Sequence, residues 1–272
     1  MNTRPPVELR KGRSGEKIFA VALFFTLIVA AAVAWFVVGP NVEDAEKAFQ
    51  KAHEGYVRAA DDAVTRLSID FEYLATQCVA SVPTRIELPS EAGSIKNVAR
   101  EFGIFNADGE SALPAVNVIA PKNPALQSAK NSPYCYDILY ARSPFTGEKA
   151  ILFTAAFENA IGETFVLVME ADGVPFAENL LSGDPARQDI LLLVAQDGRV
   201  IASDSKRPKI DNLIKWVEKT SSKEGEPQPL YVSIRDRIAG FSACESGGNA
   251  FRLGFSPVSG TDWMLCQIEF VE

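Results

Sequence analysis

Histidine and closely spaced cysteines are nearly absent from the chain. His53 is the one histidine among 272 residues, and the four cysteines stand far apart, with no Cys-x-x-Cys pair. The usual ligand sets for zinc, and the Ser-His-Asp and Cys-His arrangements of hydrolases, are therefore hard to assemble. Because no nucleophile or metal accompanies the carboxylates, we expect no catalytic residue, no metal site and no cofactor, and so no enzyme.

Basic residues are scarce beyond the first 17 positions. Those positions hold five Lys and Arg and two Glu, whereas residues 18–272 hold 22 Lys and Arg against 33 Asp and Glu, a net charge of −11. Nucleic acids and anionic membrane surfaces attract basic patches. The acidic balance therefore predicts that nucleic acid is not a partner of this protein.

Polar residues are almost absent between residues 18 and 38, where Thr26 is the one exception. At about 1.5 Å per residue, this run of 21 residues spans roughly 30 Å as a helix, which matches the apolar core of a bilayer. A cleaved signal peptide is the alternative, but its apolar stretch is usually shorter, at about 7–15 residues. The adjacent Trp35 and Phe36 also suit a membrane interface. The sequence predicts a transmembrane helix over residues 18–38.

The charges that flank this run differ on its two sides. Five basic residues precede it, and Glu43, Asp44 and Glu46 follow it. By the positive-inside rule, residues 1–17 form a cytoplasmic tail and the chain beyond the run lies outside the cytoplasm. We therefore expect a single-pass protein of the cell's inner membrane, in contact with the lipid bilayer through residues 18–38, with a periplasmic or extracellular domain.

No proline occurs between residues 42 and 81, and Gly55 is the one glycine there. The stretch follows a Gly39-Pro40 break and predicts a long helix over residues 42–81, because its apolar residues recur in steps of three and four. These are Phe49, Ala52, Tyr56, Ala60, Ala63, Leu67, Phe71, Leu74 and Cys78. The stripe fits packing on the chain's own domain, and its steps equally fit the heptad seam of a homodimer through residues 42–81.

Beyond the long helix, short apolar runs are separated by turn residues. Residues 101–113 and 191–203 each place Asp-Gly between two apolar segments, at positions 108–109 and 197–198. Asp-Gly suits the positive backbone angles of a tight hairpin turn. Two such hairpins, each followed by further short apolar runs, suggest a duplicated module.

The predicted fold class is α+β, with a long helix that carries two antiparallel-sheet modules. An amphipathic helix is expected at residues 211–220. Strands are expected after the first hairpin at residues 138–142, 150–157 and 164–170, and after the second at residues 230–235, 240–244, 251–256 and 263–270.

The order and spacing of these segments resemble the double Cache ectodomain of bacterial membrane receptors. The resemblance rests on residues 140–157, 162–181, 189–205 and 260–270 and extends over nearly all of the chain beyond residue 42. It implies a membrane-distal PAS-like module at residues 82–184, a membrane-proximal PAS-like module at residues 185–272, and ligand binding in signal transduction.

One motif of that family is missing. Members that bind amino acids carry an Arg-x-Trp-Tyr stretch that grips the ligand carboxylate, and residues 124–138 contain neither arginine nor tryptophan. Tyr140 matches the family's following tyrosine, and Glu170 or Asp172 matches its later acidic residue. The resemblance therefore implies the half of the site that holds an ammonium group without the half that holds a carboxylate, which weakens the case for amino acids as ligands.

The densest group of aromatic and polar residues surrounds Tyr140. Tyr136, Asp137 and Arg142, together with Tyr134, could join it in walling a small-molecule pocket, which needs aromatic surfaces and a few polar groups. The same residues fit an ordinary half-buried strand with tyrosines along its edge.

Two carboxylates stand at the end of the predicted strand 164–170. Glu170 and Asp172 could hold a cationic ligand group there. Asp172 equally fits a plain Asp-Gly turn with Gly173. The candidate ligand-binding residues are Tyr140, Arg142, Tyr136, Asp137, Glu170 and Asp172.

The cysteines lie outside the cytoplasm in this topology, where an oxidising compartment permits disulfides. We expect a bridge between Cys78 and Cys135, since both belong to the distal module, and reduced thiols at Cys244 and Cys266. If residues 251–256 form an intervening strand, the last two lie about 10 Å apart, beyond the roughly 7 Å between Cα atoms that a disulfide allows.

Two functions fit these features. The first is a membrane-anchored extracytoplasmic small-molecule sensor that lacks its own output domain, since the chain stops at Glu272 directly after its last predicted strand. The alternative is a membrane-tethered accessory subunit that makes protein contacts in a larger membrane complex.

Overall fold

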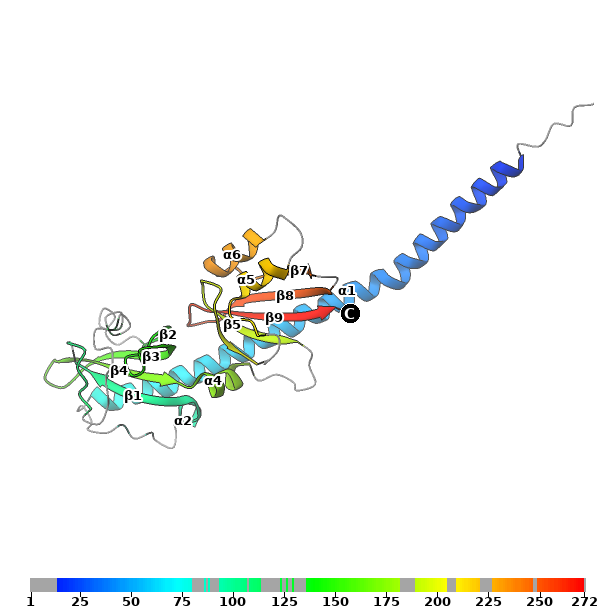
Figure 1. Ribbon diagram of the computed structural model, residues 1–272. Coiled ribbons are helices and arrows are strands. Elements are labelled where there is room, and N and C mark those ends of the chain that lie inside the picture. Colours follow the sequence, from blue (N-terminus) through cyan, green and yellow to red (C-terminus); the bar gives the residue numbers. More distant parts are fainter. Residues whose placement is uncertain are drawn as a thin grey trace, which may run out of the picture. The chain divides into compact units, whose positions relative to one another are not determined.

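The computed structural model describes most of the chain (Figure 1). The described residues are 14–79, 93–106, 108–113, 136–181, 189–204, 209–220, 227–246 and 249–271, with Ile86, Leu88, Asn123, Leu126 and Ala129. The chain divides into two compact units, residues 1–51 and residues 52–272. Helix α1 (Ser14–Val79) contributes residues to both units.

Helix α1 includes nearly all of the two helices predicted at residues 18–38 and 42–81. It continues through Gly39 and Pro40, so the predicted break between them is not present. An interior proline costs about 3 kcal/mol in helix stability, a local cost that does not by itself end a helix with long helical runs on both sides. Among the residues that the structure describes, no helix has the length and apolar character needed to cross a membrane. The predicted span, residues 18–38, falls where side chains are not described and stays a prediction.

Sheet A contains four antiparallel strands in the order β1-β4-β3-β2. Its central strands β3 and β4 are buried at nearly every position, which suits strands that are covered on both faces. The elements are α2 (Gly93–Val98), β1 (Ala99–Phe105), β2 (Tyr136–Arg142), β3 (Lys149–Glu158), β4 (Thr164–Ala171) and α4 (Gly173–Leu180).

The first predicted hairpin is only partly formed. Its turn is present, with a φ of 80° at Gly109. The returning segment makes an isolated bridge between Phe105 and Ser111, and β1 instead pairs with β4 over most of its length. The Asp-Gly signal located the turn but not the partner strand, because pairing between distant segments leaves no local trace in the sequence.

Sheet B contains five antiparallel strands in the order β6-β5-β9-β8-β7. The second predicted hairpin is confirmed, since β5 and β6 pair on either side of Gly198, whose φ is 79°. The elements are β5 (Ile190–Val194), β6 (Val200–Ser203), α5 (Leu213–Thr220), α6 (Pro227–Asp236), β7 (Gly240–Ser246), β8 (Asn249–Pro257) and β9 (Met264–Val271).

One predicted strand is a helix. Residues 230–235 lie in α6, where Leu230 and Ile234 are buried in the same apolar cluster as β5, β8 and β9. These two residues are four positions apart and therefore lie on one face of a helix. The sequence predicted a strand because this stretch is one of the short apolar runs after the second hairpin, whereas its packing against sheet B takes place as a helix.

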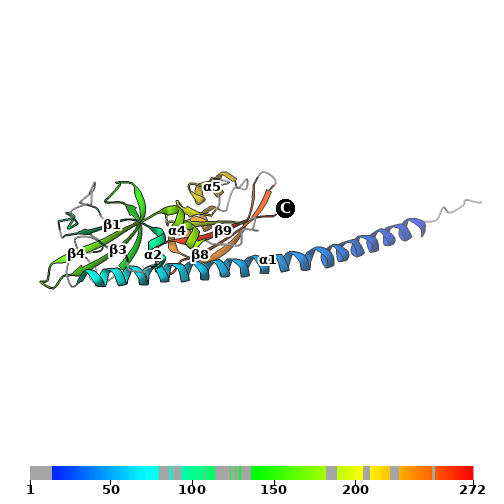
Figure 2. The ribbon, with the colours of Figure 1, turned by 90° about the horizontal axis from the view of Figure 1, so that it is seen from below.

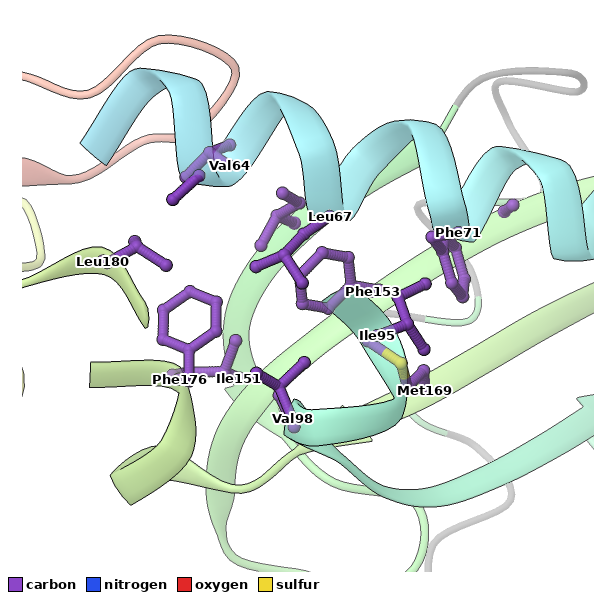
Figure 3. Packing of buried hydrophobic residues seen from close by; sticks show 14 of the residues in the cluster. Val64, Leu67, Phe71, Ile95, Val98, Ile151, Phe153, Met169, Phe176 and Leu180 are labelled. Carbon is purple, nitrogen blue, oxygen red and sulfur yellow. The ribbon is translucent and has the colours of Figure 1, made fainter. Parts of the chain in front are cut away.

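Residues 52–79 of α1 lie against one face of each sheet (Figure 2). Figure 3 shows Val64, Leu67 and Phe71 on the side of α1 that faces the buried residues of sheet A and α4, among them Phe153 and Phe176. The rings of Phe71 and Phe153 have centroids 5.6 Å apart.

Sheet B joins the same cluster. Leu191, Trp263 and Leu265 are buried in it, and Phe176 of α4 lies with its ring 5.8 Å from Trp263. The apolar stripe of α1 from Ala60 onward therefore packs on the chain's own domain, as one reading of the sequence predicted. Over that length the stripe is not available as the seam of a homodimer.

Candidate ligand site on the outer face of sheet A

Sheet A has two buried faces. The face toward α1 contributes Ile138, Phe153 and Met169 to the cluster around the helix. The opposite face, called the outer face here, contributes Leu152 and Val168 to a separate apolar cluster, which also contains Phe105, Leu126, Ala129, Phe145, Ala156 and Val166. Since side chains alternate along a strand, the register decides which polar groups share the outer face.

Asp137 on β2, Thr154 on β3 and Glu170 on β4 are polar residues that share the outer face by this alternation. Asp137 is opposite Thr154, and Glu170 is opposite Leu152. Directly opposed residues have Cβ atoms about 4.5–5.5 Å apart, and diagonal neighbours such as Thr154 and Glu170 lie about 7–8 Å apart. The three side chains therefore form one polar group across β2, β3 and β4.

Thr154 is the unusual member of this group. It is fully buried, and its Oγ1 atom has no hydrogen-bond partner within the part of the chain that the structure describes. A buried hydroxyl without a partner costs about 1–3 kcal/mol. An unsatisfied donor and acceptor at the centre of a sheet face is a position where a bound molecule can make a hydrogen bond.

Glu170 is buried as well, at 1% exposure, but its carboxylate already has partners in the chain. Oε1 lies 3.1 Å from Nη1 of Arg100, and Oε2 accepts from the hydroxyl of Ser143. The Ser143 Oγ in turn accepts from the backbone N–H of Phe145 at 3.0 Å. Glu170 therefore links β1 to the turn between β2 and β3, and Arg100 balances its charge.

The structure divides the predicted cluster between the two faces of β2. Asp137 lies on the outer face, whereas Tyr136, Tyr140 and Arg142 alternate with it on the other side. Tyr140 packs against the cluster around α1, and Lys149 lies with its Nζ 5.6 Å from the tyrosine ring centroid. The predicted grouping of these four side chains in one pocket is therefore not found, because alternation along a strand separates neighbours in sequence.

The remaining predicted residues take structural positions. Tyr136, 40% exposed, lines an apolar cavity of about 140 Å³ between α1 and β3. The backbone oxygen of Arg142 accepts from the side-chain amide of Asn123. Asp172 is the N-cap of α4, with Oδ1 accepting from the Val174 N–H at 3.1 Å, so it begins a helix there. Tyr134 lies outside the described residues.

Sequence reasoning missed Thr154, Ser143 and Arg100. Thr154 had a detectable signal, since it is the one polar residue in the apolar run 150–157. Ser143 and Arg100 had none, because both act through a carboxylate that lies far from them in the sequence.

The cysteines differ in part from the prediction. Cys78 is a free thiol that points into the cluster around α1, with Sγ 3.4 Å from the Leu74 oxygen. Burial raises the pKa of this thiol to about 11. The predicted bridge from Cys78 to Cys135 is therefore not present, and Cys135 lies outside the described residues. Strand β8 lies between the strands that hold Cys244 and Cys266, as the sequence analysis predicted for two cysteines that form no disulfide.

Comparison with solved structures gives the fold a class. The extracellular domain described as that of histidine kinase rpHK1S-Z16 matches with a TM-score of 0.58 and 13% identity, over 85% of this chain and 96% of the other. The ligand-binding domain of the Pseudomonas fluorescens chemoreceptor CtaA, with L-serine, matches with a TM-score of 0.57 and 14% identity, over 83% and 97%.

A third match is the ligand-binding domain of the Pseudomonas aeruginosa amino acid chemoreceptor PctB, with L-arginine. Its TM-score is 0.56 and its identity 17%, over 83% of this chain and 87% of the other. No model of a known protein family matches the sequence, and no curated protein does. The fold is that of the extracellular Cache and PAS-like sensor domains of receptors, as the sequence predicted.

Proposed function

We propose that the chain is the extracytoplasmic sensor part of a membrane-anchored protein and that it binds a small molecule on the outer face of sheet A. The fold supports a sensor domain. The observation that carries the ligand site is the buried Thr154 hydroxyl, which has no hydrogen-bond partner among the described residues and lies opposite the carboxylate of Asp137.

The chemistry of the outer face favours a ligand that donates hydrogen bonds, such as an amine or a hydroxyl compound. Asp137 accepts such bonds, and Thr154 can donate or accept. Arg100 is the basic group that lies against the buried polar atoms, and it is already paired with Glu170. Two of the matched structures named above hold amino acids, L-arginine and L-serine, but residues 124–138 of this sequence lack the Arg-x-Trp-Tyr stretch that binds the ligand carboxylate in that family.

Thermal-shift screening of the full chain in detergent, against amines, polyols, nucleobases and carboxylates, tests this proposal. A ligand present at 100 times its Kd stabilises the folded state by about 2.7 kcal/mol, which is readily visible as a raised midpoint. The Thr154→Val variant keeps the shape of the side chain and removes its hydroxyl. It should weaken the affinity for the ligand by about tenfold and so give a smaller thermal shift at the same ligand concentration.

Thr76→Val is the matched control. Thr76 is exposed on α1, and its hydroxyl donates to the Tyr73 oxygen. This variant should keep the full shift. If both variants bind equally well, the outer face is not the ligand site.

We infer that residues 18–38 anchor this domain, with residues 1–17 in the cytoplasm. In a background without native cysteines, a thiol introduced as Ile161→Cys should react with an impermeant maleimide in cells whose outer membrane is permeabilised. Ile161 is 78% exposed in the turn between β3 and β4. A thiol introduced as Ser14→Cys should be protected. The reverse pattern would overturn the topology and exclude an extracytoplasmic sensor.

The second candidate is the accessory subunit, and the satisfied state of Glu170 favours it. A carboxylate whose two oxygens already contact Arg100 and Ser143 does not require a ligand. An accessory subunit should copurify with a larger membrane complex and show no thermal shift with any compound in the screen.

A further inference from the structure

His53 lies in a socket on sheet B. It is 1% exposed, and it extends from α1 toward the face of sheet B that the helix covers. A row of register partners crosses this face from β5 to β7, formed by Leu191, Gln267, Gly254 and Phe241.

Glycine makes room for the imidazole in this row. A Cβ atom at Gly254 would lie 2.9 Å from His53 Nδ1 and 3.2 Å from Phe241 Cε1. The Phe241 ring meets the imidazole edge-on, with centroids 5.4 Å apart. Ser256, two residues farther along the same face of β8, has its Oγ 2.9 Å from His53 Nε2. The imidazole ring therefore fits closely against Gly254, Phe241 and Ser256, and these contacts define the socket.

The hydrogen bonding of this socket is incomplete. Within the described part of the chain, His53 Nδ1 and Gln267 Oε1 have no hydrogen-bond partner, although both are buried. Gln267 uses its Nε2 to donate to Asp189 Oδ2 at 2.8 Å. Burial lowers the pKa of His53 to about 4, and the smaller influence of the neighbouring Gln267 side chain raises that pKa.

The groups in contact with the imidazole carry no charge of their own. They are Gly254 and Ser256 on β8, Gln267 on β9 and Phe241 on β7. Arg252 on β8 and Glu269 on β9 share this face of the sheet by alternation, and they pair with each other at 3.0 Å. The carboxylate of Asp189 reaches the ring only through Gln267. On α1 itself, the charged neighbours in sequence are Lys51 and Glu54, which are both exposed.

We propose that the His53 socket is an acid-released catch between α1 and sheet B. When the imidazole takes up a proton from solvent, it becomes a cation in a buried site, and the carboxylate on the same face, Glu269, is already paired with Arg252, so the charged form is unfavourable. Moving the ring out to water relieves this cost, and the turn of α1 around His53 separates from β8 and β9. If the chain is a sensor that signals through α1, external acidity would act on the same helix as the ligand. This regulatory role rests on the function proposed above.

A single histidine makes the first test direct. The full chain, without a histidine tag and labelled with ¹³C-histidine, gives one imidazole Cε1–H signal in detergent micelles. Its chemical shift, followed from pH 8 to pH 3.5, should have its midpoint near 4. A midpoint near 6.5, the ordinary value for histidine, would show that the ring is not held in the socket and would overturn the proposal.

The second test follows the helix. Hydrogen exchange of α1 residues 50–57, corrected for the intrinsic effect of pH, should be roughly a hundredfold faster at pH 4 than at pH 7. Residues 67–74, which pack on sheet A, should keep their protection. In His53→Gln, which can still bond Ser256 and does not titrate, residues 50–57 should exchange equally at both values. An equal acid effect in wild type and variant would overturn the catch.

Gln267→Glu is a second variant that does not depend on removing His53. It places a carboxylate where Gln267 Oε1 stands, so the midpoint of the histidine signal should rise by at least one pH unit. The acid effect on α1 should then weaken. An unchanged midpoint would contradict the geometry of the socket. None of these measurements involves a ligand, so their failure leaves the proposed ligand site untouched, and an absent thermal shift leaves the catch untouched.

Discussion

The two sheets place their buried polar groups on opposite faces. In sheet A the face toward α1 is apolar, with Ile138 and Phe153 in the core, and the polar group around Thr154 lies on the outer face. In sheet B the face away from α1 is apolar and is covered by α5 and α6, whereas Gln267 and His53 meet on the side of the helix.

The two proposed functions, ligand binding and acid control of α1, divide along this difference. Buried polar atoms destabilise a fold unless they find partners, so their position indicates where a partner is needed. In sheet A the incomplete group is turned away from the helix and suits a ligand. In sheet B it is turned toward α1 and suits control of the helix.

The largest effect should come from the apolar side of sheet A. Phe153→Ala removes a fully buried ring that contacts Phe71 and Phe176, and we expect it to lower the free energy of unfolding by about 3–5 kcal/mol. Urea denaturation followed by near-ultraviolet circular dichroism measures the loss. Phe270→Ala is the control, since that ring is 42% exposed and should cost much less. Equal losses would mean that α1 does not rest on Phe153.

The next effect is the pH dependence of stability through His53. The folded-state pKa of about 4 lies below the ordinary value of 6.5, so the unfolded chain binds more protons between these two values. The contribution is complete above about pH 6.5 and is lost as the pH falls toward 4, by roughly 3 kcal/mol in all. The free energy of unfolding of wild type and of His53→Gln is measured across this pH range. The titration of the carboxylates affects both proteins alike, so the difference between the two curves reports His53. Parallel curves for the two proteins would contradict this expectation.

A smaller effect should follow removal of the Glu170 carboxylate. Glu170→Ala leaves the Ser143 hydroxyl without its acceptor and releases Arg100, so we expect a loss of about 1–3 kcal/mol. Arg100 is 62% exposed and can turn to solvent, which limits the cost. Glu101→Ala, at the exposed register partner of Glu170, should change stability by less than about 0.5 kcal/mol. A neutral result for Glu170→Ala would remove its role as the link between β1 and the β2–β3 turn.

Much of the fold could be predicted from local patterns. The steps of three and four in residues 49–78 fix the buried side of α1, and Asp-Gly at residues 197–198 fixes the β5–β6 hairpin. Both signals are contained within a short stretch of sequence. The pairing of β1 with β4 and the helical state of residues 230–235 depend on contacts with distant segments, so the local turn signal gave the wrong partner strand and the short apolar run gave the wrong element.

The candidate site was less predictable for the same reason. Asp137 and Glu170 were expected at a site, and by register both belong to the outer face. Tyr136, Tyr140 and Arg142 were grouped with them by closeness in sequence, whereas a strand sends alternate residues to opposite faces. The socket of His53 had no sequence signal at all. It depends on Gly254 and Gln267, which become neighbours only when β8 pairs with β9.

The smallest effect concerns the side of α1 that faces away from these contacts. Gly55 lies two residues from His53 and is exposed, and a Cβ atom there would meet nothing within 4 Å. Glycine inside a helix is less favourable than alanine by about 0.5–1 kcal/mol, so Gly55→Ala should stabilise the chain by that amount. Gly254, on the sheet side, has no such space, because its Cβ would press on the His53 ring. Urea denaturation at low protein concentration measures the gain. If Gly55→Ala were instead destabilising, and more so as the protein concentration rises, the exposed side of α1 would be in contact with a second copy of the chain.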